Sequence, residues 1–248
     1  MTTLAKSKIE SVRWEGRDIF LLSPMRRLLQ ALDSLHQPTT AEERLGLIVG
    51  RPGLGKTLGC RYYAATHPNV VHIQLPPAAA LKANGALTSL IESRLGMPAI
   101  ARGSLLRRMD AVIEELRARP RMLLLDTAHR LKYDHVDTFR YFSDEAHVPI
   151  AFVSVPALLG LFQDREEFAR RLHVSRALEE PKPWEITALM PRGLPDEITE
   201  AVYSITGGSV GRIVVLSRHI RRSSVNPSDW TPDLLQRTAN ALTLAPAA

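Results

Sequence analysis

The sequence is poor in the residues on which disulfide, redox and metal chemistry depend. Its 248 residues include one cysteine, Cys60, so no disulfide can form within the chain. It contains neither a Cys-x-x-Cys pair nor a His-Glu-x-x-His helix, and His129 and His135 lack the spacing of a zinc site. The letters Gly-x-Ser-x-Gly occur at residues 207–211, but they lie in a helical pattern and not between a strand and a helix, where the elbow of many serine hydrolases lies. These observations argue against a metalloenzyme and against a serine hydrolase.

Long hydrophobic runs are missing as well. The longest apolar stretch, residues 150–162, is interrupted by Pro156 and is too short to span a bilayer. The amino-terminal residues MTTLAKSKIE lack the basic-then-apolar order of a secretory signal. We therefore expect a cytoplasmic protein that makes no membrane contact and in which Cys60 serves only in packing.

Acidic residues are outnumbered by basic ones. The chain has 26 Asp and Glu against 32 Lys and Arg, which gives a formal net charge of +6. Such an excess suggests a polyanionic partner. No tail made only of lysine and arginine occurs, so the fold or an oligomer would have to assemble a nucleic-acid surface. The candidate residues for contacting DNA phosphates are Lys82, Arg94, Arg102, Arg107 and Arg108. The alternative is an ordinary solvated surface.

The most informative segment that the chain does contain is Gly-Arg-Pro-Gly-Leu-Gly-Lys-Thr at residues 50–57, directly after the apolar run Leu45–Val49. Such a loop turns its backbone N–H groups toward the phosphates of a nucleotide, while Lys56 reaches the β- and γ-phosphates and the Thr57 hydroxyl binds Mg²⁺. The following helix adds its positive amino-terminal end. We therefore predict a site for ATP and Mg²⁺. The expected nucleotide contacts are Gly50, Arg51, Pro52, Gly53, Leu54, Gly55, Lys56, Thr57, Leu58 and Arg212.

Asp126 is the second candidate ligand for Mg²⁺. It follows the apolar run Met122–Leu125, which has the composition of a strand buried on both faces. In phosphate-loop ATPases a carboxylate at such a strand end orients the water shell of Mg²⁺ opposite the loop hydroxyl, here that of Thr57. The alternative is that Asp126 caps the next loop.

Strand and helix patterns alternate through most of the chain, after a predicted helix over residues 20–35. We predict strands at 45–49, 70–75, 122–125, 149–155 and 184–189. This alternation predicts an α/β fold with a parallel sheet flanked by helices and with the loop at its carboxyl edge. After residue 191 the pattern is helical throughout. We expect residues 1–191 to form a nucleotide-binding α/β domain with an amino-terminal helical extension, and residues 192–248 to form a small helical lid and a tail.

Four segments together resemble the AAA+ ATPases. They are the phosphate loop, Leu123–Leu131, Val148–Leu158 and the lid motif Gly207–Arg212. Within the AAA+ ATPases the chain is most similar to the transposition regulators of the Mu B, TniB and TnsC type, over roughly residues 15–222. The resemblance implies a P-loop NTPase that forms a homo-oligomeric ring or helical filament, coats double-stranded DNA without strong sequence preference, and delivers the site to a transposase.

The resemblance also implies roles for three arginines. Arg170 and Arg171 lie where the family has an arginine finger that reaches the γ-phosphate of a neighbouring subunit, and Arg171 is the preferred candidate. The alternative is an exposed helix charge that pairs with Glu166 or Glu167. Arg212 resembles a second sensor that contacts the phosphates, and otherwise belongs to the lid surface.

The chain departs from this family at two catalytic positions. Thr127 replaces the catalytic glutamate after Asp126, and a threonine cannot act as a general base at neutral pH. Ser154-Val155 replaces the Gly-Thr of the sensor strand, so either Ser154 makes that contact or ATP is hydrolysed slowly. The resulting candidate catalytic residues are Lys56, Asp126, Thr127, Ser154, Arg171 and Arg212. A nucleotide-dependent scaffold without hydrolysis stays open, whereas the helical lid argues against a small-molecule kinase.

Overall fold

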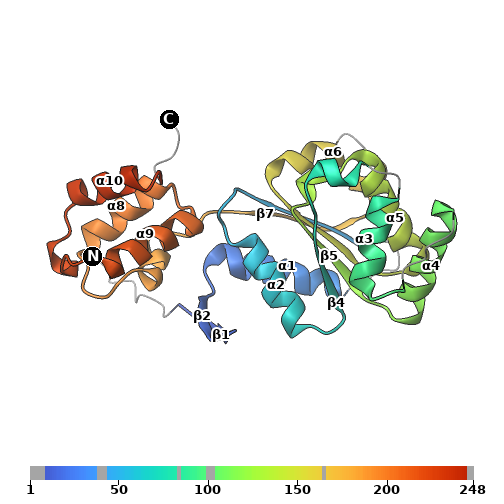
Figure 1. Cartoon of the computed structure of the whole chain (residues 1–248), viewed down its shortest axis with the longest axis horizontal. Helices are drawn as coiled ribbons and strands as arrows, with labels where there is room; N and C mark the ends of the chain where they lie inside the picture. Colours follow the sequence, from blue (N-terminus) through green and yellow to red (C-terminus); the bar gives the residue numbers. More distant parts are fainter. Residues whose placement is uncertain (1–8, 38–43, 83–84, 99–103, 164–165, 245–248) are drawn as a thin grey trace. The chain divides into compact units, whose positions relative to one another are not determined.

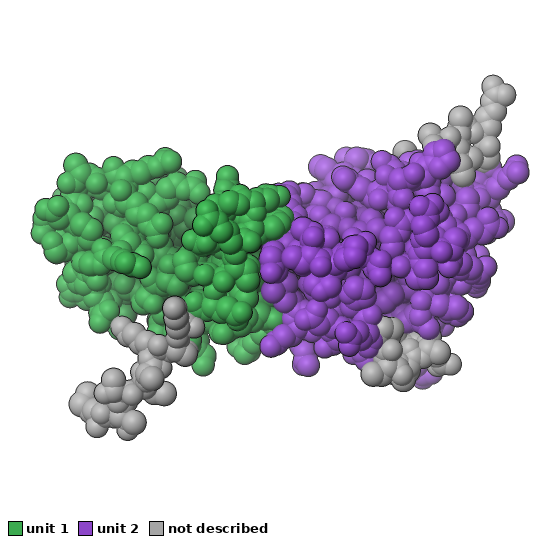
Figure 2. Space-filling model, turned by 90° about the horizontal axis from the view of Figure 1, so that it is seen from below, with its two compact units in different colours: residues 1–27, 51–55, 179–248 green, residues 28–50, 56–178 purple. Residues whose placement is uncertain are grey.

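The computed structural model of the chain describes residues 9–37, 44–82, 85–98, 104–163 and 166–244. The chain divides into two compact units, drawn in green and purple in Figure 2. The green unit is formed from residues 1–27, 51–55 and 179–248, and the purple unit from residues 28–50 and 56–178. The phosphate loop therefore belongs to both units, since the chain passes from one to the other at Arg51 and back at Lys56.

The purple unit is built on a five-stranded parallel sheet in the order β4-β5-β6-β3-β7. Its strands are β3 (Leu45–Gly50), β4 (Val70–Gln74), β5 (Met122–Asp126), β6 (Ile150–Ser154) and β7 (Leu172–Leu178). All residues of β3, β5 and β6 are buried, as expected for central strands covered on both faces. The sheet pairs Val49 with Ser154 and Val153 with Asp126, so the carboxyl ends of three adjacent strands lie at one edge.

Helices cover both faces of this sheet. Figure 1 shows α3, α4 and α5 on one side, and α1 and α2 on the other. The helices with their bounds are α1 (Ser23–His36), α2 (Lys56–Thr66), α3 (Ala86–Leu95), α4 (Leu105–Ala118), α5 (Tyr133–Ala146), α6 (Leu159–Gln163) and α7 (Glu166–Ala169). The main core packs Leu47 and Phe152 of the sheet against Val112 of α4 and Phe139 of α5. The α/β fold predicted from the alternation of patterns is confirmed.

The described part of the green unit combines a β-hairpin with a helical bundle. The hairpin pairs β1 (Ser11–Trp14) with β2 (Arg17–Phe20), and the bundle contains η4 (Pro183–Leu189), α8 (Asp196–Thr206), α9 (Val210–Arg222) and α10 (Pro232–Ala241). Ile198, Ile213, Leu216 and Leu235 form the centre of its own hydrophobic core. The predicted helical lid is therefore present and has a core that is separate from that of the sheet.

Two predictions about local structure are wrong. Residues 184–189 form the 3₁₀ helix η4 and not a strand, because Pro183 begins the helix and the Glu185 side chain accepts a hydrogen bond from the Lys182 N–H at 2.8 Å. The fifth strand is β7, an edge strand whose exposed and buried residues do not form a continuous apolar run. The predicted helix over 20–35 begins at Ser23, after the unpredicted hairpin.

Candidate nucleotide site

The phosphate loop has the backbone that its glycines predict. Gly53 and Gly55 have φ values of +85° and +82°, in the left-handed region that favours glycine. Helix α2 begins at Lys56, whose Nζ donates to the carbonyl oxygen of Gly50 at 2.5 Å. Burial lowers the pKa of Lys56, against the opposing attraction of Asp126 and Cys60. The ammonium group is therefore held at the mouth of the loop.

Other predicted nucleotide contacts from the loop differ in their exposure. Arg51, Pro52 and Gly53 are exposed, and Leu58 on the first turn of α2 is 41% exposed. Leu54 is buried and anchors the loop. The loop thus presents its backbone and its charged residues to solvent, as a site for a polar ligand requires.

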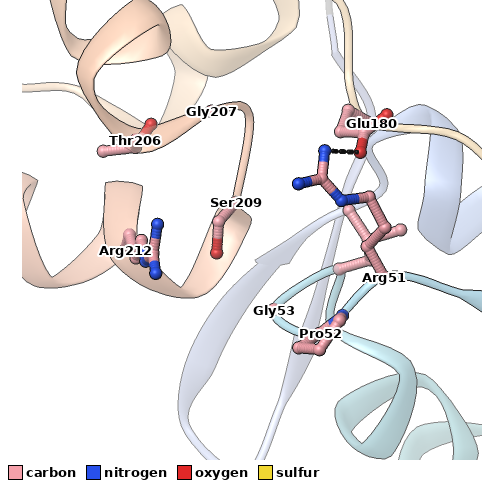
Figure 3. A pocket seen from close by; sticks show the side chains of 9 residues that line it. Arg51, Pro52, Gly53, Glu180, Thr206, Gly207, Ser209 and Arg212 are labelled. Atoms are coloured by element: carbon pink, nitrogen blue, oxygen red, sulfur yellow. Dashed lines mark hydrogen bonds and ion pairs between the residues drawn. The ribbon is translucent and has the colours of Figure 1, made fainter. Parts of the chain in front are cut away.

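Within the green unit, loop residues 51–54 line a pocket of about 300 Å³ together with Glu180, Thr206, Gly207, Ser209 and Arg212 (Figure 3). Arg51 Nη1 lies 3.0 Å from Glu180 Oε1. In Figure 3 Ser209 lies between Arg212 on α9 and Arg51 on the loop. The structure therefore brings Arg212 to the same pocket as the loop, where its guanidinium group favours an anionic ligand while Arg51 pairs with Glu180.

Helix α9 begins directly against this loop. Ser209 occupies the N-cap position but its side chain makes no capping hydrogen bond. The Gly211 N–H instead donates to the carbonyl oxygen of Gly53 at 2.9 Å, and a Cβ at Gly53 would collide with the Ser209 side chain. The loop backbone therefore accepts a hydrogen bond from this end of the helix.

At the carboxyl edge of the sheet, Asp126 is 2% exposed. Its Oδ1 accepts a hydrogen bond from the Thr127 N–H at 2.8 Å, which is the loop-capping contact considered above. Burial works to raise the pKa of Asp126, but interactions with His72, Thr57 and the Thr127 N–H outweigh it and lower that pKa. Asp126 is therefore an ionised carboxylate at neutral pH, as a magnesium ligand must be.

Four buried polar atoms at this edge have no hydrogen-bond partner among the described residues. They are Asp126 Oδ2, Thr127 Oγ1, Ser154 Oγ and His72 Nε2. Since buried polar atoms are almost always paired, such a group points to a ligand, an ion or water. Three are oxygen atoms, the ligand type that Mg²⁺ prefers. The residues present therefore fit a hydrated Mg²⁺ at this edge of the sheet.

Thr127 has an unusual backbone conformation. Its φ of 63° and ψ of 35° lie in the left-handed region, which is rarely occupied by a β-branched residue. Its hydroxyl group is too short and too weakly basic to replace a carboxylate that activates water. The strain nevertheless marks this position as one that the surrounding structure holds firmly.

His72 is a site residue that the sequence analysis missed. Its Nε2 lies 3.8 Å from Asp126 Oδ2, and its side chain is 16% exposed. His72 pairs with Leu124 in the sheet, two residues before Asp126, so both polar side chains point to the same face. The only sequence signal was a histidine among the apolar residues of β4.

The two arginine-finger candidates lie at the amino-terminal ends of the strands, opposite to the end at which Asp126 lies. The Arg171 carbonyl oxygen accepts a hydrogen bond from the Leu45 N–H at the beginning of β3, and its side chain pairs with Asp144 of α5. About 17 Å of strand, at about 3.3 Å per residue, separates this point from the end of β3. Arg170 pairs with Glu166 at 2.6 Å, as the alternative interpretation expected, while the Glu167 side chain lies outside the described residues.

The candidate DNA residues differ in their surroundings. Lys82, Arg94 and Arg107 are exposed, and Lys82 lines a pocket together with Leu105 at the start of α4. Arg108 is engaged within the chain, because its Nη2 lies 2.5 Å from Glu92 Oε2 and also donates to Ser89 Oγ at 2.7 Å. Arg102 lies outside the described residues. The structure therefore brings Lys82 close to α4 and gives Arg108 an internal ion pair.

Cys60 is completely buried in α2, and burial raises the pKa of its thiol. A neutral buried thiol packs as a small apolar group and is chemically inert. In the described part of the chain, no helix combines the length and the apolar character that crossing a membrane requires. The same residues contain no group of three or more His, Cys, Asp or Glu side chains that could hold a metal ion by themselves.

Comparison with known proteins finds one family in the sequence and one fold in the structure. The model of the AAA domain matches residues 39–162. The fold is similar to that of the ORC2 protein of Aeropyrum pernix, solved in ADPNP-ADP complexes, with 16% identity and a TM-score of 0.59 over 88% of this chain and 66% of that one. No curated protein matches the sequence.

Two further archaeal structures are similar. Cdc6p of Pyrobaculum aerophilum has 17% identity and a TM-score of 0.60 over 88% of this chain and 62% of its own. The ORC1 protein of Aeropyrum pernix, solved in complex with DNA, has 15% identity and a TM-score of 0.57 over 89% of this chain and 64% of its own. The present chain thus spans less than two thirds of each of these three proteins. The shared feature is the P-loop AAA+ fold.

Proposed function

This chain belongs to the AAA domain family, and from that premise we propose that it binds ATP and Mg²⁺, assembles on double-stranded DNA, and regulates the choice of target by a transposase. The observation that supports the nucleotide part is a group of three buried oxygen atoms without hydrogen-bond partners at the carboxyl edge of the sheet. They are Asp126 Oδ2, Thr127 Oγ1 and Ser154 Oγ. The resemblance of residues 148–158 to transposition regulators supports the part that concerns the transposase.

The proposed nucleotide contacts follow from the chemistry of each residue. The loop N–H groups and the start of α2 bind the phosphates, and Lys56 contributes a point charge. Thr57 and Asp126 hold Mg²⁺, which neutralises phosphate charge when it is bound. Arg212 contacts the nucleotide from the lid pocket.

Hydrolysis is proposed to be slow. Thr127 supplies no general base, and the buried Ser154 Oγ is the hydroxyl that remains at the end of β6 to orient a water molecule or a phosphate oxygen. Thr127 and Val155 also favour a second candidate function, a scaffold that binds ATP and does not hydrolyse it. In both cases bound nucleotide acts as a switch for assembly.

Homo-oligomer formation is proposed from the position of Arg171. Arg171 lies at the amino-terminal ends of the strands and cannot reach a nucleotide bound at the carboxyl end of the same sheet. It would therefore contact the nucleotide of a neighbouring subunit in a ring or filament. Lys82, Arg94 and Arg107 are exposed cations that could contact DNA phosphates from each subunit. The internal pairing of Arg108 with Glu92 suits a role in holding α4 for this contact.

Electron microscopy of the protein with ATP, Mg²⁺ and duplex DNA tests the proposal directly. We expect rings or filaments on DNA with the wild type and none with Lys56→Ala, which should lose ATP binding, whereas Lys82→Ala should still bind ATP. A transposition assay with a transposase from the same genome should show altered target choice when this protein is added. Assembly without nucleotide, or unchanged target choice, would contradict the corresponding part of the proposal.

Phosphate release measured against nucleotide affinity separates a slow ATPase from a scaffold. If the missing carboxylate limits turnover, Thr127→Glu should raise hydrolysis, with Thr127→Gln as the matched control of similar size and no charge. Wild-type turnover equal to that of a relative with an intact Asp-Glu pair would show that another base exists. Transfer of the γ-phosphate to a small acceptor would instead identify a kinase.

A further inference from the structure

Helix α9 carries an unusual concentration of positive charge. Its 13 residues include Arg212, Arg218, Arg221 and Arg222 together with His219, and the sequence from Ala201 to Ser228 contains no Asp or Glu. Ile213, Leu216, Ser217 and Ile220 are buried on one side of the helix. The carboxyl-terminal end of the helix therefore exposes a face, here called the α9 basic face, formed by Arg218, His219, Arg221 and Arg222.

The arginines of the α9 basic face differ from several other arginines of the structure, which pair with carboxylates. Arg140 on α5 pairs with Asp137 and Asp144, and Arg237 on α10 lies 3.7 Å from Asp233. Among the described residues, no carboxylate lies within ion-pair distance of the arginines of the α9 basic face. Like charges three and four residues apart repel one another, so this arrangement costs helix stability.

The helix dipole explains only part of this charge. Cations in the last turn interact favourably with the carboxyl end of a helix, and the effect falls off within that turn. Arg221 is also fixed in place, since its Nη2 donates to the Leu189 carbonyl oxygen at 3.0 Å. It lines a pocket of about 580 Å³ with the exposed Arg192, which extends the positive surface beyond the helix. An unpaired and partly fixed row of guanidinium groups is suited to a polyanion.

We infer that the α9 basic face binds the phosphate backbone of duplex DNA, as a contact separate from the α4 region. The inference rests on the proposed DNA-binding function. Arg218 and Arg222 are one helical turn apart, about 6 Å along the axis, so both guanidinium groups can reach phosphates of one strand. Contacts of this kind give affinity without base readout.

The chemistry of the face favours duplex DNA over other anions. Val215, 44% exposed, is the large exposed apolar residue of α9, and one valine is too little for insertion into a membrane interface. The helix contains no Phe, Tyr or Trp on which unpaired bases could stack, as in proteins that bind single strands. Phosphates held in a regular duplex remain as the matching partner.

The test compares two double variants of the full chain that lose the same charge. Arg218→Ala/Arg222→Ala removes two members of the α9 basic face, and Arg17→Ala/Arg237→Ala removes two exposed arginines elsewhere in the green unit. Fluorescence anisotropy with a labelled duplex is measured at several salt concentrations, with and without ATP and Mg²⁺. We expect the first variant to bind about tenfold more weakly and to reduce the slope of log affinity against log salt by about 2. The control should change affinity less than twofold.

Equal binding by the two variants would overturn the inference. The same measurement in a Lys56→Ala background separates this outcome from a failure of the proposed function. If assembly fails in all conditions but the residual DNA binding falls with Arg218→Ala/Arg222→Ala, the α9 contact stands and the assembly proposal does not. If ATP-dependent assembly on DNA is intact and unaffected by the double variant, the inference alone is wrong. Binding to vesicles of phosphatidylserine and phosphatidylcholine without binding to duplex would also overturn it.

Discussion

At the scale of single residues, the site depends on glycines and on one unsatisfied carboxylate oxygen more than on any catalytic base. Gly53 combines a left-handed φ with direct contact to the lid residue Ser209. Asp126 Oδ2 has no hydrogen-bond partner among the described residues and lies 3.8 Å from His72 Nε2, whereas Oδ1 accepts a hydrogen bond from the Thr127 N–H. The sequence motifs predicted both residues but not His72 beside Asp126. His72 lies on a different strand, and only the register of the sheet brings it next to Asp126.

Gly53→Ala should destabilise the protein and weaken ATP binding. The left-handed backbone costs alanine about 1–3 kcal/mol, and the new Cβ would also collide with the Ser209 side chain. Gly16→Ala is the matched control, since its φ of +74° imposes similar strain but no atom lies within 4 Å of the added Cβ. Urea unfolding should show a larger loss for Gly53→Ala, and Ser209→Gly should recover part of the difference. Equal losses in the two variants would show that contact with the lid is unimportant.

At the scale of helices and strands, the sequence patterns predicted the buried central strands and failed where a local turn or partial burial determines the element. The central strands β3, β5 and β6 were predicted because each is a largely apolar run beside a loop signal, and the edge strand β4 was predicted from Val70, Val71 and Ile73. The 3₁₀ helix η4 was read as a strand because its apolar residues resemble one, whereas Glu185 and Pro183 turn the backbone. The edge strand β7 was missed because only one of its faces is covered. The hairpin at Ser11–Phe20 was missed although Glu15 and Gly16 have the positive φ values of a tight turn.

Glu185→Gln should destabilise the fold, because the buried Glu185 carboxylate caps the start of α1. It accepts hydrogen bonds from the Ser23 N–H at 2.8 Å, from the Ser23 hydroxyl group, from Arg26 Nη2 at 3.2 Å and from the Lys182 N–H at 2.8 Å. A glutamine places an NH₂ group against donors, and the expected loss is about 2 kcal/mol of unfolding free energy. Glu200→Gln changes an exposed carboxylate on α8 and should have little effect in the same denaturation experiment. A loss equal to that of the control would rule out the capping role.

The junction of α1 with α2 should make stability depend on pH. Burial lowers the pKa of His36, repulsion by His67 lowers it further, and attraction by Asp33 opposes both. A histidine with a lowered pKa in the folded state takes up its proton more readily when unfolded. Its contribution to stability is therefore complete above about pH 6.5 and is lost as the pH falls below that value. Urea unfolding between pH 7.5 and 5.5 should show a steeper loss for the wild type than for His36→Asn, and parallel curves would contradict the assignment.

At the scale of the whole molecule, the sheet places the end of β3 and Arg171 at opposite ends of its strands. The nucleotide loop follows the carboxyl end of β3, and Arg171 precedes β7 at the opposite edge. The sequence alone did not show at which end of the sheet Arg171 lies. Arg171 directly precedes β7, and β7 was not predicted. With β7 identified, an arginine finger at residue 171 requires a second copy of the chain.

Arg171→Ala should therefore abolish ATP-dependent assembly while leaving ATP binding by the single subunit unchanged. The wild-type side chain pairs with Asp144, so the variant also removes an ion pair whose loss by itself could disturb α5. Asp144→Asn breaks the same pair and keeps the arginine, which makes it the matched control. Sedimentation with ATP, Mg²⁺ and duplex DNA should show monomers for Arg171→Ala and assemblies for Asp144→Asn, because only the first variant lacks the cation that we propose contacts the γ-phosphate of a neighbouring subunit. Loss of assembly in both variants would show that Arg171 only stabilises its own subunit through the pair with Asp144. Unchanged assembly in Arg171→Ala would show that Arg171 is not the arginine finger.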